Sequence, residues 1–131
     1  MIGVDTNVLV RFLVEDDAHQ SKRAGQLFRR ALAKGERLFI SDVVLCEVVW
    51  VLEGAYRVPR GEIAALRLDL ARAKQVQLGD ADIVHRALTA FQAGKGDFAA
   101  YVIRERALEA GCSALATFEK KLWAEAGFEK V

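Results

Sequence analysis

Short apolar runs alternate along this chain with longer stretches of helical periodicity, and this alternation limits the possible folds more than any other feature. Parallel neighbouring strands need a long crossover between them, which a helix supplies. Each crossover helix also covers one face of the sheet. The pattern therefore predicts an α/β protein built from βαβ units, with a parallel sheet covered by helices on both faces.

The expected strands are short, and the expected helices lie between them. We expect strands at Met1–Asp5, Arg37–Ser41, Gln75–Gly79, Cys112–Thr117 and Gly127–Val131. We expect helices at Asn7–Val14, Ala18–Lys34, Asp42–Arg57, Arg60–Ala73, Asp80–Ala93 and Asp97–Ala110. Gly35 and Gly111 stand where helix C-terminal caps belong. Ligands of such sheets bind beyond the carboxyl ends of the strands, so polar residues at these ends are the candidates for function.

Length and composition predict one domain over residues 1–131, because 131 residues lie within the usual range of about 100–150 for a single domain. The 19 Lys and Arg nearly balance the 18 Asp and Glu, so any contact with nucleic acid must be local. The longest near-apolar run, Val43–Leu52, is shorter than the roughly 20 residues of a membrane span. We expect a cytoplasmic protein, with Cys46 and Cys112 as reduced thiols that fill the core.

Four acids stand at positions where a carboxylate can have a function. Asp5 ends the first expected strand, and Glu47 is the one charge in the run Val43–Leu52. A charge on the apolar side of a helix is costly unless it has a partner, and the helical wheel separates Glu47 from the solvent-facing stripe of Asp42, Glu53 and Arg57.

The other two acids flank later elements. Asp97 begins a helix and Glu119 follows the fourth strand. Structural roles compete with function at these positions: Asp5 and Asp97 suit helix N-caps, and Glu119 suits an exposed charge beside two lysines.

Convergence of the four acids would create a strong need for a cation. At about 6 Å and an effective dielectric of about 20, each carboxylate pair repels by roughly 3 kcal/mol. A cluster of this kind takes up protons or binds cations, and its hard oxygen ligands favour Mg²⁺ or Mn²⁺. Such an ion activates water and neutralises charge on a phosphodiester.

Four segments in order resemble the PIN domain family, most closely its VapC toxin branch. They are Asp5-Thr6-Asn7-Val8-Leu9, Ser41-Asp42-Val43-Val44-Leu45-Cys46-Glu47-Val48, Asp97-Phe98-Ala99-Ala100-Tyr101-Val102-Ile103 and Ala116-Thr117-Phe118-Glu119-Lys120-Lys121-Leu122. The resemblance covers nearly the whole chain. It implies a three-layer α/β/α sandwich with a parallel sheet of strand order 3-2-1-4-5 and the acids at its carboxyl edge.

The resemblance also implies the roles of the site residues. Asp5, Glu47, Asp97 and Glu119 correspond to the Mg²⁺ or Mn²⁺ ligands of an endoribonuclease that cleaves single-stranded RNA by a metal-activated water. Thr6 and Thr117 match hydroxyl positions that steady the acids, and Asn7 matches a polar position beside the first acid. Toxins of this branch are commonly homodimers held by a VapB-like antitoxin.

Two positions depart from the family pattern. The family usually has Asp where this chain has Glu119, and many members have Asp where it has Ala100. Glu keeps the charge but lengthens the reach, whereas Ala removes an auxiliary acid. An alternative function is therefore a catalytically degenerate PIN domain that serves as an RNA-binding or assembly module.

Further residues have weaker assignments. Candidate phosphate contacts are Arg11, Lys95, Arg104, Lys120 and Lys121. Candidate apolar contacts with a partner are Leu27, Phe28, Leu66 and Leu70. Phe98 and Tyr101 suit core packing better than base stacking, and His19 and His85 lack the spacing of metal ligands.

Two other enzyme classes fit the sequence less well. A haloacid-dehalogenase-like phosphatase needs Asp at the position of Asn7. A response-regulator receiver domain needs a phosphoacceptor at the end of the third strand, where Gly79 stands, although Asp80 follows. The chain contains no GxGxxG or P-loop motif that would favour nucleotide binding.

Overall fold

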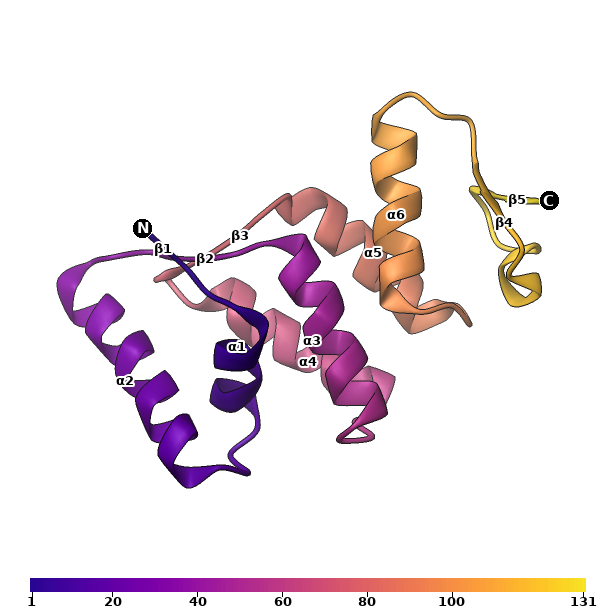
Figure 1. Ribbon diagram of the computed structural model, residues 1–131. Coiled ribbons are helices and arrows are strands. Elements are labelled where there is room, and N and C mark those ends of the chain that lie inside the picture. Colours follow the sequence, from indigo (N-terminus) through magenta and orange to yellow (C-terminus); the bar gives the residue numbers. More distant parts are fainter. The chain divides into compact units, whose positions relative to one another are not determined.

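The computed structural model describes residues 1–131, apart from the side chains of residues 67 and 68. The chain forms two compact units, Met1–Asp80 and Ala81–Val131 (Figure 1). Both units combine helices with parallel strands, as the alternating sequence pattern predicts.

The first unit is built around a three-stranded parallel sheet. In chain order its elements are β1 (Ile2–Gly3), α1 (Thr6–Leu13), α2 (Ala18–Lys34), β2 (Leu38–Ile40), α3 (Asp42–Gly54), α4 (Arg60–Arg72) and β3 (Val76–Leu78). β2 is the central strand: Leu38 pairs with Ile2 on one side and with Val76 on the other. α1 packs against both α2 and α3, so that Leu9 is fully buried.

α2 shows how local signals fix an element. The Asp17 carboxylate accepts a hydrogen bond from the Gln20 backbone N–H at 3.0 Å and caps the first turn. Gly35 ends the helix in the left-handed region at φ 63°, which a glycine adopts without steric cost. Between these ends the helix buries Ala24, Phe28 and Ala31, and Phe28 stacks on Phe12 of α1 with ring centroids 3.8 Å apart.

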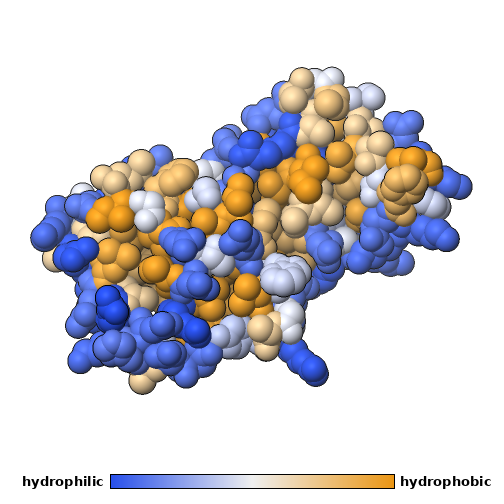
Figure 2. Space-filling model, in the orientation of Figure 1, coloured by the Kyte–Doolittle hydropathy of each residue, from blue (hydrophilic) through white to orange (hydrophobic). Residues whose placement is uncertain are grey.

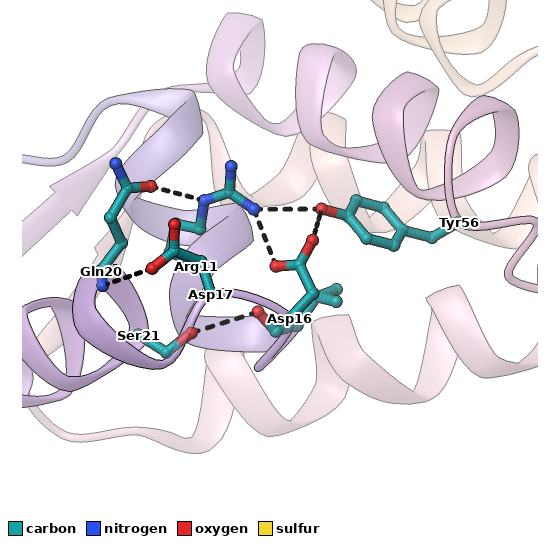
Figure 3. A network of polar contacts seen from close by, with 7 residues as sticks. Arg11, Asp16, Asp17, Gln20, Ser21 and Tyr56 are labelled. Carbon is teal, nitrogen blue, oxygen red and sulfur yellow. Dashed lines mark hydrogen bonds and ion pairs between the residues drawn. The ribbon is translucent and has the colours of Figure 1, made fainter.

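A polar network on the first unit joins the end of α1, the turn before α2 and the segment after α3 (Figure 3). The Arg11 guanidinium binds Asp16 at 2.7 Å and also donates to Gln20 and Tyr56. The Tyr56 hydroxyl donates to Asp16 at 2.6 Å. This hydrogen bond is the main reason that the pKa of Asp16 lies below its ordinary value; Arg11 also lowers it, against the loss of hydration.

We expect Tyr56→Phe to raise the pKa of Asp16 towards the ordinary aspartate value, because the main stabiliser of the ionised carboxylate is lost while Arg11 remains. NMR titration of the Asp16 carboxyl carbon measures this shift. The internal control in the same variant is the carboxyl of Glu105 in the second unit, because its lowered pKa depends on Arg86 and Arg104 and should not move when Tyr56 is changed. An unchanged Asp16 titration would show that the hydroxyl does not stabilise the carboxylate.

The second unit pairs two helices with two parallel strands. Its elements are α5 (Ala81–Ala93), α6 (Phe98–Glu109), β4 (Leu115–Thr117), the 3₁₀ turn η1 (Lys120–Leu122) and β5 (Phe128–Lys130). α5 packs against α6, and the core contains Val84, Phe91 and Tyr101 with no exposed surface. β4 pairs with β5, with Leu115 opposite Phe128.

An ion-pair network anchors α6 in this unit. Glu105 accepts from Arg86 of α5 at 2.9 Å and from Arg104 at 2.9 Å. The Arg104 guanidinium lies over the rings of Tyr101 and Phe128 and donates to the Ala126 carbonyl. Burial by itself would raise the pKa of Glu105, but the two guanidinium groups outweigh it and the pKa is lowered.

All eleven expected helices and strands are present in the chain, with differences at their ends. β1 ends at Gly3 rather than Asp5, although the Val4 backbone N–H still donates to Phe39. α3 ends at Gly54 rather than Arg57, because Arg57 adopts a left-handed conformation at φ 53°. β4 begins at Leu115 rather than Cys112.

The strand order is confirmed only in part. The two sheets have the orders β1-β2-β3 and β4-β5 and are separate, so the full order 3-2-1-4-5 is not confirmed. None of the helices in the described part of the chain combines the length and the apolar character that crossing a membrane requires.

Two expectations about burial were wrong. Cys112 is exposed rather than a core residue, because it lies in the turn that follows α6. Phe28 and Leu70 are buried in the first unit, so neither is available to a partner, and Leu27 and Leu66 are half-buried. Hydrophobic side chains nevertheless reach the surface in patches bordered by hydrophilic ones (Figure 2).

Candidate functional site

Thr6 connects two of the predicted acids in the first unit. It begins α1 directly after the first strand, and its backbone N–H donates to Asp5 Oδ1 at 2.8 Å. Its hydroxyl donates to Glu47 Oε2 of α3 at 2.5 Å. Because Thr6 itself is buried, both carboxylates are held from a fixed position beside the end of β1.

The donor chemistry of this pair fits a hard divalent cation. Within the described part of the chain, the hydrogen bonds use one oxygen of each carboxylate and leave Asp5 Oδ2 and Glu47 Oε1 without a protein donor. The ion pairs there likewise involve neither acid. Two neighbouring carboxylates with no cationic partner are hard oxygen ligands of the type that Mg²⁺ and Mn²⁺ bind.

Glu47 is exposed, so the expectation of a charge on a buried apolar face was wrong. Its neighbours on the same side of α3, Val43 and Trp50, are 65% and 76% exposed. The buried side of α3 instead carries Leu45, Val48 and Leu52. The apolar residues around Glu47 thus form part of the surface, and Thr6 supplies its partner.

Asp5 also has the structural role of a helix N-cap, which the sequence offered as the alternative to a functional role. It is the N-cap of α1 and its carboxylate receives the first backbone N–H of the helix. A cap uses one carboxylate oxygen, so the cap and a metal contact are compatible. Asn7 is exposed in the first turn of α1.

Asp97 precedes α6 and is exposed, and its carboxylate makes no capping hydrogen bond. The loop ahead of it is held from a distant part of the chain. The Gly96 N–H donates to the Tyr101 hydroxyl at 2.9 Å, and this hydroxyl donates to Glu125 at 2.8 Å. Glu125 also accepts from the Lys95 N–H at 3.2 Å, so the loop that places Asp97 has defined partners.

The two glycines of this loop are required by close packing. A Cβ atom at Gly94 would collide with the Tyr101 hydroxyl and Glu125, and a Cβ atom at Gly96 would lie 2.5 Å from Leu122. Since real Cβ atoms essentially never approach so closely, a larger residue would displace the loop. The tight packing on both sides therefore fixes the backbone that leads into Asp97.

Glu119 is exposed after β4, and its backbone makes two local hydrogen bonds: its carbonyl accepts from the Leu122 N–H at 3.0 Å, and its N–H has a partner in β4. Its backbone N–H donates to the Thr117 hydroxyl at 3.0 Å. Trp123 in turn donates from its indole Nε1 to the Thr117 carbonyl at 2.9 Å. Thr117 thus steadies the backbone of the acid rather than its carboxylate.

The predicted site residues divide between the two units. Asp5, Thr6, Asn7 and Glu47 lie in the first unit, and Asp97, Thr117 and Glu119 lie in the second. Among the described side chains, no group of three or more His, Cys, Asp or Glu residues is placed to hold a metal ion. Thr6 joins Asp5 to Glu47, and the convergence of all four acids stays a prediction.

Two of the proposed phosphate contacts have structural partners instead. Arg104 is 8% exposed and bound to Glu105, so its assignment as a phosphate contact was wrong. Arg11 is engaged with Asp16 and Tyr56. Lys95, Lys120 and Lys121 are exposed.

One acid that follows the central strand β2 was not among the predicted site residues. Asp42 was assigned to a solvent-facing stripe, but it is 4% exposed and its carboxylate accepts from the Val43 N–H at 2.9 Å. The position of Asp42 could have indicated a structural role, because this residue follows a buried strand and is the first residue of a helix, where the helix dipole favours an acid. The supporting role of Glu125 for the Asp97 loop had no comparable sequence signal.

Comparison with known families identifies a match over nearly the whole chain. The family model for the PIN domain matches residues 2–129 and so spans both units. A search of curated proteins finds no matching sequence.

Proposed function

The chain belongs to the PIN domain family, whose members are generally metal-dependent nucleases, and on this basis we propose that it is an endoribonuclease for single-stranded RNA that requires Mg²⁺ or Mn²⁺. The observation that supports this proposal most strongly is the double role of Thr6. One residue binds both Asp5 and Glu47, and neither acid has a cationic partner among the described side chains.

We propose Asp5, Glu47, Asp97 and Glu119 as the residues that hold the ion, in a single domain over residues 1–131. The fold would then be a three-layer α/β/α sandwich whose strand order is 3-2-1-4-5. When bound, the ion supplies activation of a water and neutralisation of phosphate charge. The residues of the chain supply positioning: Thr6 orients two carboxylates, and Thr117 supports the backbone of Glu119.

Electrostatic stabilisation of the phosphodiester also belongs to the proposal. Negative charge accumulates on the phosphate oxygens during hydrolysis, and fixed cations lower the energy of that state. Lys120 and Lys121 directly follow Glu119 and are exposed, so both are available for this role. Asn7, beside the first acid, offers an amide that can orient a water or the substrate.

The order of the motifs supports a toxin of the VapC type. On this proposal the chain acts in the cytoplasm, forms a homodimer and binds a VapB-like antitoxin that inhibits it. Separate and combined expression tests this assignment. Growth arrest by the toxin alone, relieved by the product of a neighbouring small gene, is the expected result.

Purified chain should cut single-stranded RNA in Mg²⁺ or Mn²⁺ and stop when EDTA removes the ion, because the carboxylates alone activate no water. End-labelled RNA resolved on a denaturing gel measures this, with double-stranded RNA of the same sequence as the uncut control. Cleavage that continues in excess EDTA would contradict the proposal. RNA binding without cleavage in either ion would favour the degenerate domain, in agreement with Ala100 and Glu119.

A further inference from the structure

α2 carries a dense row of exposed cations, and we propose that this face binds the phosphate backbone of the RNA substrate outside the acid site. The cations are Lys22, Arg23, Arg29, Arg30 and Lys34. The inference rests on the proposed function in taking RNA as the polyanion. It goes further by assigning the segment of the chain that holds the strand.

The five cations share one side of the helix. At about 100° per residue they fall within an arc of about 140°. Ala24, Phe28 and Ala31, which are buried, lie outside this arc, and Phe28 stacks on α1. The cationic face is thus the side of α2 that packing within the first unit leaves in solvent.

The charge of α2 is local and unbalanced. The helix holds 5 of the 19 Lys and Arg and none of the 18 Asp and Glu, so the rest of the chain is net negative. The ion pairs among the described side chains use Arg11, Arg86 and Arg104 but none of the cations of α2. A nearly neutral protein therefore presents one face that attracts a polyanion.

A groove between α1 and α2 connects this face with the candidate site. The groove has a volume of about 360 Å³, and its lining includes Asn7, Arg11, Gln20 and Arg23. Arg11 is held by Asp16 and Tyr56 (Figure 3). Arg23 is the other guanidinium of the groove and takes part in none of the ion pairs among the described side chains, so it is available to a phosphate. Asn7 stands two residues after Asp5, which places one end of the groove next to the acids.

The composition of the face favours nucleic acid over a protein partner. The residues between the cations are His19, Gln26 and Ala33, without a large apolar side chain. Protein interfaces have apolar cores depleted in charge, especially in Lys. Phosphate contacts come largely from Lys and Arg and need no apolar core.

The test compares Arg23→Gln/Arg30→Gln with the matched control Arg72→Gln/Lys74→Gln, which removes two exposed cations of the first unit outside α2. Anisotropy of a short fluorescein-labelled single-stranded RNA is measured in EDTA, so that binding is read without cleavage. Each lost phosphate contact should flatten the slope of log K against log salt by about 0.7, and two contacts should weaken binding at low salt between about tenfold and a hundredfold.

A flatter slope and weaker binding in the α2 variant alone would support the inference. Equal losses in the control variant, unchanged binding in the α2 variant or no binding by the unchanged chain would each overturn it. Unchanged RNA binding would point instead to an acidic protein as the partner of α2. Binding and cleavage are measured separately. If the unchanged chain cleaves RNA but the α2 variant binds RNA as tightly as the unchanged chain, only this inference is refuted. If RNA binding depends on the cations of α2 but the unchanged chain does not cleave, only the proposed nuclease function is refuted.

Discussion

The Asp5→Asn chain should cleave RNA at least about a hundredfold more slowly than the unchanged chain, since a lost ligand of the ion costs several kcal/mol of transition-state stabilisation. The fold should persist. Asn is as good an N-cap as Asp, and its amide oxygen can still accept the Thr6 N–H that Asp5 Oδ1 accepts now. Initial rates on labelled RNA at saturating Mg²⁺ measure the effect, and thermal unfolding measures the fold.

The matched control is Asp69→Asn, which removes an exposed acid of α4 outside the candidate site. Its cleavage rate should equal that of the unchanged chain. Equal purification of both variants also excludes a contaminating ribonuclease, since a contaminant would cut in both preparations. Full activity in Asp5→Asn would remove Asp5 from the proposed set of ligands.

The Glu105→Ala chain should lose about 3–5 kcal/mol of unfolding free energy, because it leaves a buried guanidinium without its carboxylate. Arg104 and Glu105 are each 8% exposed. Arg104 Nε already lacks a hydrogen-bond partner among the described atoms, so the remaining contacts compensate poorly. Urea unfolding followed by circular dichroism measures the loss.

Arg86→Gln is the matched control, because it removes the more exposed cation of the network, whose side chain is 47% exposed. Exposed ion pairs contribute about 1 kcal/mol or less, so this variant should stay close to the unchanged chain. Equal losses of unfolding free energy in both variants would show that the buried Arg104–Glu105 pair stabilises the protein no more than the exposed Arg86–Glu105 pair does. A Glu105→Ala chain with unchanged stability would contradict the prediction directly.

The same network predicts a pH dependence. The pKa of Glu105 is lowered from its ordinary value of 4.5, so the native protein binds its proton less readily than the unfolded chain. The contribution of Glu105 is therefore complete above pH 4.5 and is lost as the pH falls through the native pKa. The difference in unfolding free energy between the unchanged chain and Glu105→Gln should therefore become smaller as the pH falls below 4.5, which urea unfolding at several pH values measures.

Elements whose limits are set by local chemistry were predictable from the sequence. α2 has the predicted bounds because Asp17 and Gly35 mark both ends. The limits of α3 and β1 were less accurate, since a strand or helix end is decided by hydrogen bonds and backbone angles that the residue pattern does not determine. Arg57 illustrates this: it continues the helical pattern but adopts a left-handed conformation.

The sequence predicted which residue types form the candidate site better than it predicted how deeply each side chain is buried and what it contacts. A charge in an apolar run predicts a special role for Glu47, but the run cannot show which side of α3 the rest of the chain covers. Arg104 illustrates the reverse case. Its charge predicted a surface role, whereas its burial depends on Glu105 and on the Tyr101 and Phe128 rings.

The contacts of Glu125 make substitutions in the glycine loop before α6 depend on the residues of the C-terminal segment. Tyr101 and Glu125 occupy the space that a side chain at position 94 would need. Each of them alone would collide with a Cβ atom there, and the Ala90 carbonyl would lie 2.9 Å from it, so a mutation at position 94 is tolerable only in a background where both side chains have already become smaller and this carbonyl has shifted. Homologues should accordingly change the glycine loop and the C-terminal segment together, as correlated substitutions separated by about thirty positions.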